Sequence, residues 1–305
     1  MNLRLKKAVC AASALATFLG TGGINFPVSA AEDGLINVLS CENADFKIKS
    51  SLGETDGENA LDGDIVSTAN FGGFNGEKIF DVNGNDGKDY IMLFTVSTEV
   101  PVPMERIKMN YEFGVAYIDG AYYSNGESMY LDKPVAPWFE GVEIFTSNTG
   151  EKGSWKKAAE FASLENMLLE ETRPEELWDD TNGIRHYYDL PLDNKVTAKY
   201  LRIAVKDMKP WLGGVVIPEF EIKASPEDVP AGYKKITLES SDRAEMKVTG
   251  SDAIGKGLYG KAGSEYTLTV TPDSVSKINS VKINGSEIEG TDGVYKFTMP
   301  SEDVT

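Results

Sequence analysis

Residues 59–67 read Asn59-Ala-Leu-Asp-Gly-Asp-Ile-Val-Ser67, a short acidic stretch with one glycine between two aspartates. Much later the chain reads Ala198-Lys-Tyr-Leu-Arg-Ile-Ala-Val205, and then Ile217-Pro-Glu-Phe-Glu-Ile222. The first stretch has the composition of a tight turn, because Gly63 lets the backbone fold back and bring neighbouring oxygens together. The other two predict β-strands. If the last strand returns beside the acidic turn, a single β-domain contains all three stretches.

The acidic turn is rich in oxygen donors. Asp62 and Asp64 offer carboxylates, and Ser67 adds a hydroxyl three residues on. Calcium takes about six to eight oxygen ligands, and a compact loop supplies roughly four or five of them. A distant acid must then close the cage, and Glu219 is placed to do so if the two stretches meet. From the residues alone, an ordinary Asp-Gly turn without an ion remains the alternative.

Short alternating runs, separated by Asn-Gly and other turn signals, predict an all-β chain. The strands are expected at 46–48, 90–96, 106–113, 141–146, 199–206 and 215–223. One segment departs from this pattern. Between Ser163 and Glu171, the residues Leu164, Met167 and Leu168 share one helical face, and Pro174 follows soon after. This spacing predicts a short helix inside a loop from about 162 to 184.

Residues 1–31 have the features of a secretory signal peptide. A basic start precedes an apolar run from Ala8 to about Leu19, and Val28-Ser-Ala-Ala31 is a small-residue cleavage site. The run is shorter than the roughly 20 residues that cross a membrane, and no later segment is apolar enough to do so. We therefore expect a secreted or cell-surface protein without a membrane span.

Charge and cysteine content narrow the class of protein. The formal net charge is −18 at pH 7, and it becomes about −21 when the three basic residues of the signal are removed. A surface this acidic repels phosphate backbones, so no nucleic-acid partner is expected. Cys41 is the only cysteine after the signal. No internal disulfide can form, and the core depends on the burial of apolar side chains.

A stiff, polar linker at 225–232 separates a first domain, 32–224, from a second, 233–305. The second domain is expected to hold strands at 235–239, 245–249, 266–271 and 277–283, and Asn284-Gly285 predicts a hairpin over 281–288. Tyr266-Thr-Leu-Thr-Val-Thr-Pro272 and Phe297-Thr-Met-Pro-Ser-Glu-Asp-Val304 resemble one unit of the bacterial surface repeats related to internalin B-repeats. An apolar strand normally follows the last motif in that family. We therefore expect the chain to be a truncated piece of a longer protein, with possible additional modules.

The first domain also resembles a known family. Gly141-Val-Glu-Ile-Phe-Thr-Ser-Asn-Thr-Gly150, with Trp155 after it, joins the three stretches quoted first. In this order they resemble the discoidin domain, or coagulation-factor type C domain, in its bacterial carbohydrate-binding, galactose-binding-like form. The acidic turn matches the family pattern Ala-Leu-Asp-Gly-Asp/Asn-x-x-Thr-x-Trp, except that Ser67 replaces threonine and Ala69 replaces tryptophan. The resemblance covers roughly residues 36–223 and implies a jelly-roll β-sandwich.

The resemblance implies a structural calcium ion. Its ligands would be Asp62, Asp64, Ser67 and Glu219, with the carbonyls of Asn59 and Pro218 as further ligands.

A sugar site would lie on loops at one end of the sandwich. Aromatic faces usually pack on the sugar ring while polar groups take its hydroxyls. Trp178 and Trp211 are the most loop-like aromatic residues, and Asp180 and Arg185 are candidate polar partners. Each aromatic residue could instead fill the core. Ligand residues vary within the family, so none is carried over by motif.

We expect a non-catalytic, calcium-stabilised carbohydrate-binding or adhesion module whose partners are glycans or a cell-surface polysaccharide. One alternative is a structural surface or protein-binding spacer module, and another is an accessory region of a larger glycoside hydrolase. A hydrolase in its own right is a third alternative. His186 is the only histidine, no nucleophile motif accompanies it, and no spacing singles out a carboxylate pair.

Overall fold

The computed structural model describes residues 34–40, 43–51, 53–61, 69–72, 77–110, 121–124, 127–130, 138–172, 184–209, 214–217, 219–239, 243–250, 252–255 and 257–305. The described residues fall into two compact units. The larger is Ala44–Lys223, and the smaller joins the residues up to Asn43 to Ala224–Thr305. Residues 1–31, where the sequence predicts a signal peptide, and Cys41 lie outside the described residues.

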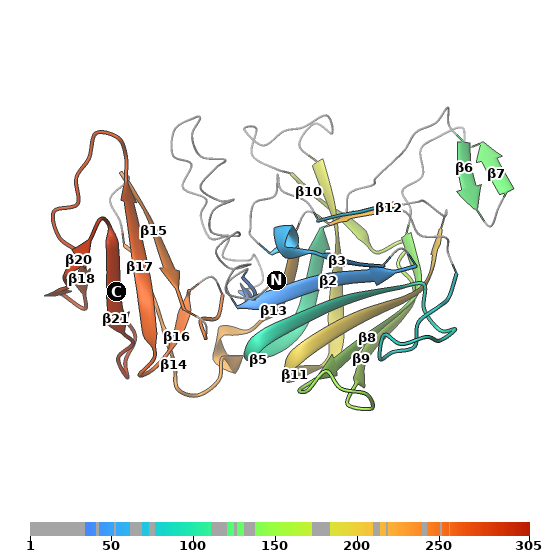
Figure 1. Ribbon diagram of the computed structural model, residues 1–305, viewed down its shortest axis with the longest axis horizontal. Coiled ribbons are helices and arrows are strands. Elements are labelled where there is room, and N and C mark those ends of the chain that lie inside the picture. Colours follow the sequence, from blue (N-terminus) through green and yellow to red (C-terminus); the bar gives the residue numbers. More distant parts are fainter. Residues whose placement is uncertain are drawn as a thin grey trace. The chain divides into compact units, whose positions relative to one another are not determined.

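Two long strands organise the larger unit (Figure 1). They are β5 (Met92–Asn110) and β11 (Ile184–Lys209), which pair antiparallel over most of their length. The register shifts between Pro191 and Val196, and again between Ala198 and Tyr200. On the two sides of this break the long strands have different neighbours, so one pair of strands contributes to two layers.

The first layer contains the start of β5 and the end of β11. There β5 pairs with β2 (Ala44–Ser50), which pairs with β3 (Gly53–Asp56), and β11 pairs with β8 (Trp138–Ser147), which pairs with β9 (Lys156–Ser163). The second layer contains the end of β5 and the start of β11. There β5 pairs with β13 (Phe220–Ala224), and β11 pairs with β10 (Leu168–Thr172).

Aromatic side chains join the two layers. Phe46 of the first layer stacks on Phe220 of the second with ring centroids 4.7 Å apart, and Phe139 lies 6.1 Å from Tyr188. These four side chains are fully buried, and each contributes about 1.5–3 kcal/mol through its removal from water. Two antiparallel layers that face each other across such a core form a β-sandwich. The predicted all-β, jelly-roll sandwich with a small C-terminal β unit is confirmed.

The alternation of residues explains why these segments are strands. In β2, the side chains at 44, 46, 48 and 50 are buried while the intervening Asp45, Lys47 and Lys49 are half-buried. In β13, Phe220 and Ile222 are buried while Glu221 and Lys223 are not. A period of two with one apolar face is the pattern of a strand packed on one side.

The helix predicted after Ser163 is wrong. The chain makes a turn there, with the amide of Met167 donating to the carbonyl of Leu164 at 3.0 Å, and β10 follows. In β10, Leu168 pairs with Tyr188 of β11. The apolar residues fit a helix and a strand equally well over this short length. Pairing with β11 supplies backbone partners that an isolated helical turn would not.

The C-terminal part of the smaller unit forms an antiparallel sheet in the order β15 (Ala244–Thr249), β17 (Glu265–Pro272), β21 (Val294–Thr298) and β20 (Gly290–Thr291). Beside it lie the pairs β14 (Tyr233–Lys235) with β16 (Tyr259–Lys261), and β18 (Lys282–Ile283) with β19 (Ser286–Glu287). The predicted hairpin is confirmed. Asn284 and Gly285 have φ of 49° and 81°, as a two-residue turn of this type requires.

The residues before Ala44 group with the smaller unit, whereas the sequence placed them in the first domain. Hydrogen bonds of Asn43 explain this grouping. The side-chain amide of Asn43 donates to the carbonyls of Val38 and Ala253, at 3.1 and 2.7 Å. Asn43 is buried, and its Oδ1 accepts a hydrogen bond from the amide of Ser40.

The remaining elements are short. They are β1 (Ile36–Asn37), β4 (Ala69–Gly72), β6 (Ala121–Ser124), β7 (Glu127–Tyr130), β12 (Gly214–Ile217) and the 3-10 turns η1 (Glu58–Ala60) and η3 (Pro226–Asp228). Among the described residues, no helix has the length and hydropathy needed to cross a membrane.

Candidate functional site

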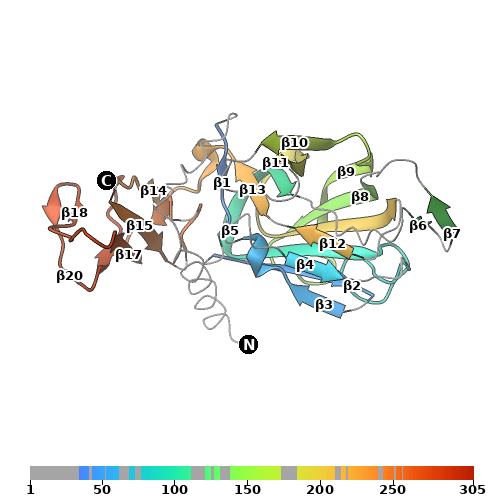
Figure 2. The ribbon, with the colours of Figure 1, turned by 90° about the horizontal axis from the view of Figure 1, so that it is seen from above.

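The acidic turn and the last strand of the larger unit are connected through β4 and β12. These two strands pair antiparallel, and Ala69 lies opposite Ile217 (Figure 2). Ahead of the turn, the amide of Gly57 donates to the carbonyl of Phe46 at 2.7 Å, and Phe46 stacks on Phe220. The chain after residue 68 therefore pairs with the chain before residue 218, and Phe46 contacts both Gly57, ahead of the turn, and Phe220, after residue 218.

Two of the six predicted metal ligands lie in the described part of the chain. Asn59 is in η1, where the neighbouring Ala60 and Leu61 are buried and hold the turn against the sandwich. Glu219 is 5% exposed, and its carbonyl accepts a hydrogen bond from the amide of Asn110 at 2.9 Å. Because a carboxylate is costly to bury without compensation, this position favours a site that supplies donors or positive charge.

The other four predicted ligands, Asp62, Asp64, Ser67 and Pro218, lie outside the described residues. Within the described ranges, no group of three or more His, Cys, Asp or Glu side chains is arranged to hold a metal ion. The structure thus describes the two flanks of the predicted calcium site but not its central loop.

The predicted sugar-binding residues are also mostly undescribed. Trp178, Asp180 and Trp211 lie outside the described residues. Arg185 is near the start of β11, and its backbone lies opposite that of Glu171 in β10. This end of β11 is next to residues 173–183, which are outside the described part of the chain.

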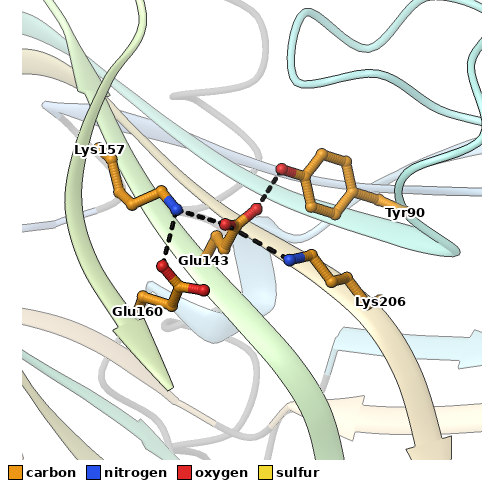
Figure 3. Close-up of polar contacts among 5 residues, drawn as sticks. All are labelled: Tyr90, Glu143, Lys157, Glu160 and Lys206. Atoms are coloured by element: carbon orange, nitrogen blue, oxygen red, sulfur yellow. Dashed lines mark hydrogen bonds and ion pairs between the residues drawn. The ribbon is translucent and has the colours of Figure 1, made fainter. Parts of the chain in front are cut away.

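A polar cluster that sequence reasoning missed lies on the first layer (Figure 3). Glu143 of β8 accepts hydrogen bonds from the hydroxyl of Tyr90 and from Nζ of Lys157 in β9. Nζ of Lys206 in β11 lies 3.4 Å from the same carboxylate, and Lys157 also bonds to Glu160 at 2.7 Å. Three strands and the segment before β5 therefore meet at one carboxylate.

The ionisation of Glu143 follows from these contacts. Burial of its side chain opposes ionisation, but the hydrogen bonds from Lys157 and Tyr90 and the charge of Lys206 outweigh it and lower the pKa of Glu143. The pKa of Lys157 is raised, chiefly by its hydrogen bond to Glu143. Burial and the bond to Glu143 raise the pKa of Tyr90. At neutral pH the carboxylate is ionised and surrounded by donors, an arrangement suited to holding the fold rather than to general acid catalysis.

Arg202 lies on the same layer, in the segment Ala198–Val205 of β11, and it contacts Trp155, which lies between β8 and β9. Its guanidinium stacks on the ring of Trp155 at 4.1 Å and donates to Oγ1 of Thr95 at 3.0 Å and to the carbonyl of Val82 at 2.6 Å. Burial lowers the pKa of Arg202 to about 10. The group remains charged at neutral pH and fastens the 77–91 segment to the sheet.

The apolar contacts under this segment form a small second core. Phe80, Tyr90, Leu93, Phe145 and Ala204 are buried together there, with Ile79, Val82 and Trp155 packed against them. Both the polar cluster and Arg202 therefore serve to fix the 77–91 segment on the first layer.

The known proteins to which this chain is similar are solved structures. No protein-family model matches the chain, and no curated protein matches it. The solved structures to which it is similar include several carbohydrate-binding modules. Chitosan-binding module 1 of a chitosanase/glucanase from Paenibacillus sp. IK-5 is 18% identical, with 61% of this chain and 97% of that chain covered and a TM-score of 0.32.

Two modules described as family 32 have similar identities, coverages and TM-scores. The one from C. perfringens NanJ, in complex with galactose, is 14% identical, with 62% of this chain and 99% of that chain covered and a TM-score of 0.33. The one from Streptococcus pneumoniae EndoD is 17% identical, with 61% and 97% covered and a TM-score of 0.33. Because these TM-scores are low, the sandwich is assigned from strand pairing and core contacts and not from these likenesses.

Proposed function

We propose that the larger unit is a non-catalytic carbohydrate-binding module that acts outside the cell. The observation that supports this proposal is the pairing of β4 with β12, a two-stranded sheet in the unit that forms the β-sandwich. It brings the chain that follows the acidic turn beside the chain that precedes Pro218, as the resemblance to discoidin domains requires. The glycan would bind on the end loops, with Trp178 and Trp211 as stacking surfaces and Asp180 and Arg185 as polar partners.

A glycan array probed with the full chain tests this proposal. The array should include neutral galactosides, chitosan oligosaccharides and uronic-acid oligosaccharides, with and without calcium. We expect saturable binding that Trp178→Ala or Trp211→Ala weakens by about tenfold or more, since one stacked aromatic residue typically carries at least about 1.4 kcal/mol of binding. Trp138→Phe, in β8, is the matched control and should bind normally. An array that stays blank under both conditions would favour a spacer module instead.

We also propose a structural calcium ion in this unit. Asp62, Asp64, Ser67 and Glu219 would be its ligands, joined by the carbonyls of Asn59 and Pro218. What supports this is the chemistry of the donor set, all oxygen, and the burial of Glu219 next to the β4–β12 pair. The ion would tie the turn to the last strand of the sandwich.

Removal of calcium tests the ion separately from the glycan. At calcium a hundredfold above the Kd, binding contributes about 2.7 kcal/mol to stability. For a unit of this size, that corresponds to a Tm lower by about 5–10 °C in chelator. Asp62→Asn should remove the calcium response, whereas Asp193→Asn, at an exposed aspartate of β11, should keep it. Equal melting temperatures with calcium and with chelator would exclude the site.

A further inference from the structure

The smaller unit is built from two stretches of chain that are far apart in the sequence. The residues up to Asn43 belong to it together with Ala224–Thr305, and the whole larger unit, Ala44–Lys223, lies between them in the chain. The linker predicted at 225–232 would instead join two modules in tandem. We name residues 34–40 and 43, the described part of the first stretch, the strap.

The side chain of Asn43 fastens the strap to the rest of the smaller unit. It is 1% exposed, and its nitrogen donates to the carbonyls of Val38, in the strap, and of Ala253, 210 residues further on. Its Oδ1 accepts a hydrogen bond from the amide of Ser40 at 2.8 Å. Because buried polar groups are costly to leave without partners, this one side chain both shapes the strap and fixes it to Ala253.

The turn that receives the strap is joined to the core of the smaller unit. Ala253 is buried in the same apolar cluster as Val248 of β15 and Tyr266 of β17. The neighbouring Asp252 accepts hydrogen bonds from the hydroxyls of Tyr266 and Ser264, at 2.7 and 2.6 Å. Loss of the strap would therefore act directly on the packing of β15 and β17.

Gly255 makes a further contact between the strap and this turn. Its amide donates to the carbonyl of Val38 at 3.4 Å. A Cβ at this position would lie 2.8 Å from the carbonyl oxygen of Asn37, closer than side chains come to such an atom. The strap therefore lies directly against the turn, and a side chain on Gly255 would push the two apart.

We propose that the strap closes the smaller unit and that its displacement opens this unit while the sandwich stays folded. The larger unit is accordingly an insertion within the smaller one, attached through both of its ends. A short segment held by local contacts is the kind of element that opens below the free energy of global unfolding. Every contact used belongs to the smaller unit, so closure by the strap requires neither a glycan nor calcium.

Hydrogen exchange of the full chain, followed by mass spectrometry, measures this opening. Asn43→Ala removes the bond to Ala253 and should speed the exchange of amides in β15 and β17 by at least about tenfold. Slow amides of β5 and β11 should keep their native rates. Asn37→Ala is the matched control, because the Oδ1 of Asn37 accepts a bond from the amide of Leu39 inside the strap. Its effect on β15 and β17 should stay within about twofold.

A change on the other side of the contact gives an independent test. Gly255→Ala should also speed exchange in β15 and β17, by at least about tenfold relative to Gly263→Ala. Both glycines have positive φ, 66° and 85°, but a Cβ at Gly263 would meet nothing within 4 Å. This pair separates displacement of the strap from backbone strain alone. If circular dichroism shows that Asn43→Ala does not fold, the exchange rates of Gly255→Ala decide.

Three outcomes would overturn the role of the strap. Unchanged exchange in β15 and β17 in both Asn43→Ala and Gly255→Ala would show that the smaller unit is closed without it. Equal acceleration in β5 and β11 would show that the strap holds the sandwich as much as the smaller unit. An effect of Asn37→Ala as large as that of Asn43→Ala would show that the bond to Ala253 is not what fastens it.

Discussion

Substitution of Glu143 by glutamine should loosen the 77–91 segment and destabilise the larger unit. The side chain of Glu143 is 9% exposed. It receives a hydrogen bond from Tyr90 and charged contacts from Lys157 and Lys206. Glutamine has nearly the same shape but no charge, so the variant isolates the electrostatic part of this cluster.

The expected loss of stability depends on how exposed each partner of Glu143 is to solvent. The side chains of Lys157 and Lys206 are 43% and 36% exposed, so solvent screens both ion pairs, and each contributes about 0.2–1 kcal/mol. The hydroxyl of Tyr90 is buried, and a hydrogen bond to a charged acceptor contributes about 1.5–3 kcal/mol. Glutamine can still accept this bond as a neutral group. We therefore expect a loss of about 2 kcal/mol, or about 4–8 °C in Tm.

Differential scanning calorimetry of the full chain measures this loss. Glu160→Gln is the matched control. Its side chain is 55% exposed and bonds only to Lys157 in the cluster, so its Tm should change by no more than about 2 °C. If Glu143→Gln is as mild as Glu160→Gln, the carboxylate does not hold the segment.

The stabilisation that Glu143 provides should decrease as the pH falls. The pKa of Glu143 is lowered by folding, so its stabilising contribution is complete above the ordinary pKa of a glutamate. The contribution is lost as the pH falls through the folded pKa. The difference in Tm between the native chain and Glu143→Gln should accordingly shrink as the pH is lowered from about 7 to about 3. A difference that stays constant would contradict the assigned ionisation.

Two further substitutions test the packing of each unit. Phe220→Ala removes a fully buried ring that joins the two layers and should cost about 3–5 kcal/mol in the free energy of unfolding, measured by denaturant titration. Gly257→Ala should destabilise the smaller unit by at least about 1 kcal/mol more than Gly263→Ala. Both glycines have positive φ, but a Cβ at Gly257 would lie 2.5 Å from the carbonyl oxygen of Val248, whereas one at Gly263 would meet nothing within 4 Å. Equal losses would mean that backbone strain alone matters.

The sequence predicted parts of the central strands β2, β5, β8, β11 and β13 because their alternation is local. It did not predict that β5 and β11 would be so long, since Pro101, Pro103 and Pro191 interrupt the pattern. In the structure these prolines lie near the register shift, where each strand passes from one layer to the other. Proline is tolerated at such irregular positions because ladder bonds are already interrupted there.

The candidate sites, too, could be predicted only where their residues are neighbours in the chain. Motif residues that are adjacent in the chain, such as those of the acidic turn, can be recognised from the sequence. Tyr90, Glu143, Lys157 and Lys206 are far apart in the chain and have no motif. Only the pairing of β8 with β9 and β11 brings them to one carboxylate. No local signal in the sequence could have identified this cluster.

Because β5 and β11 belong to both layers, the backbone of each of these strands joins one layer to the other, on both sides of the register shift. Native-state hydrogen exchange should therefore report a single opening free energy for slow amides drawn from both halves of each strand. The two shared strands thus make the sandwich one cooperative body, in which damage to one layer is felt by the other.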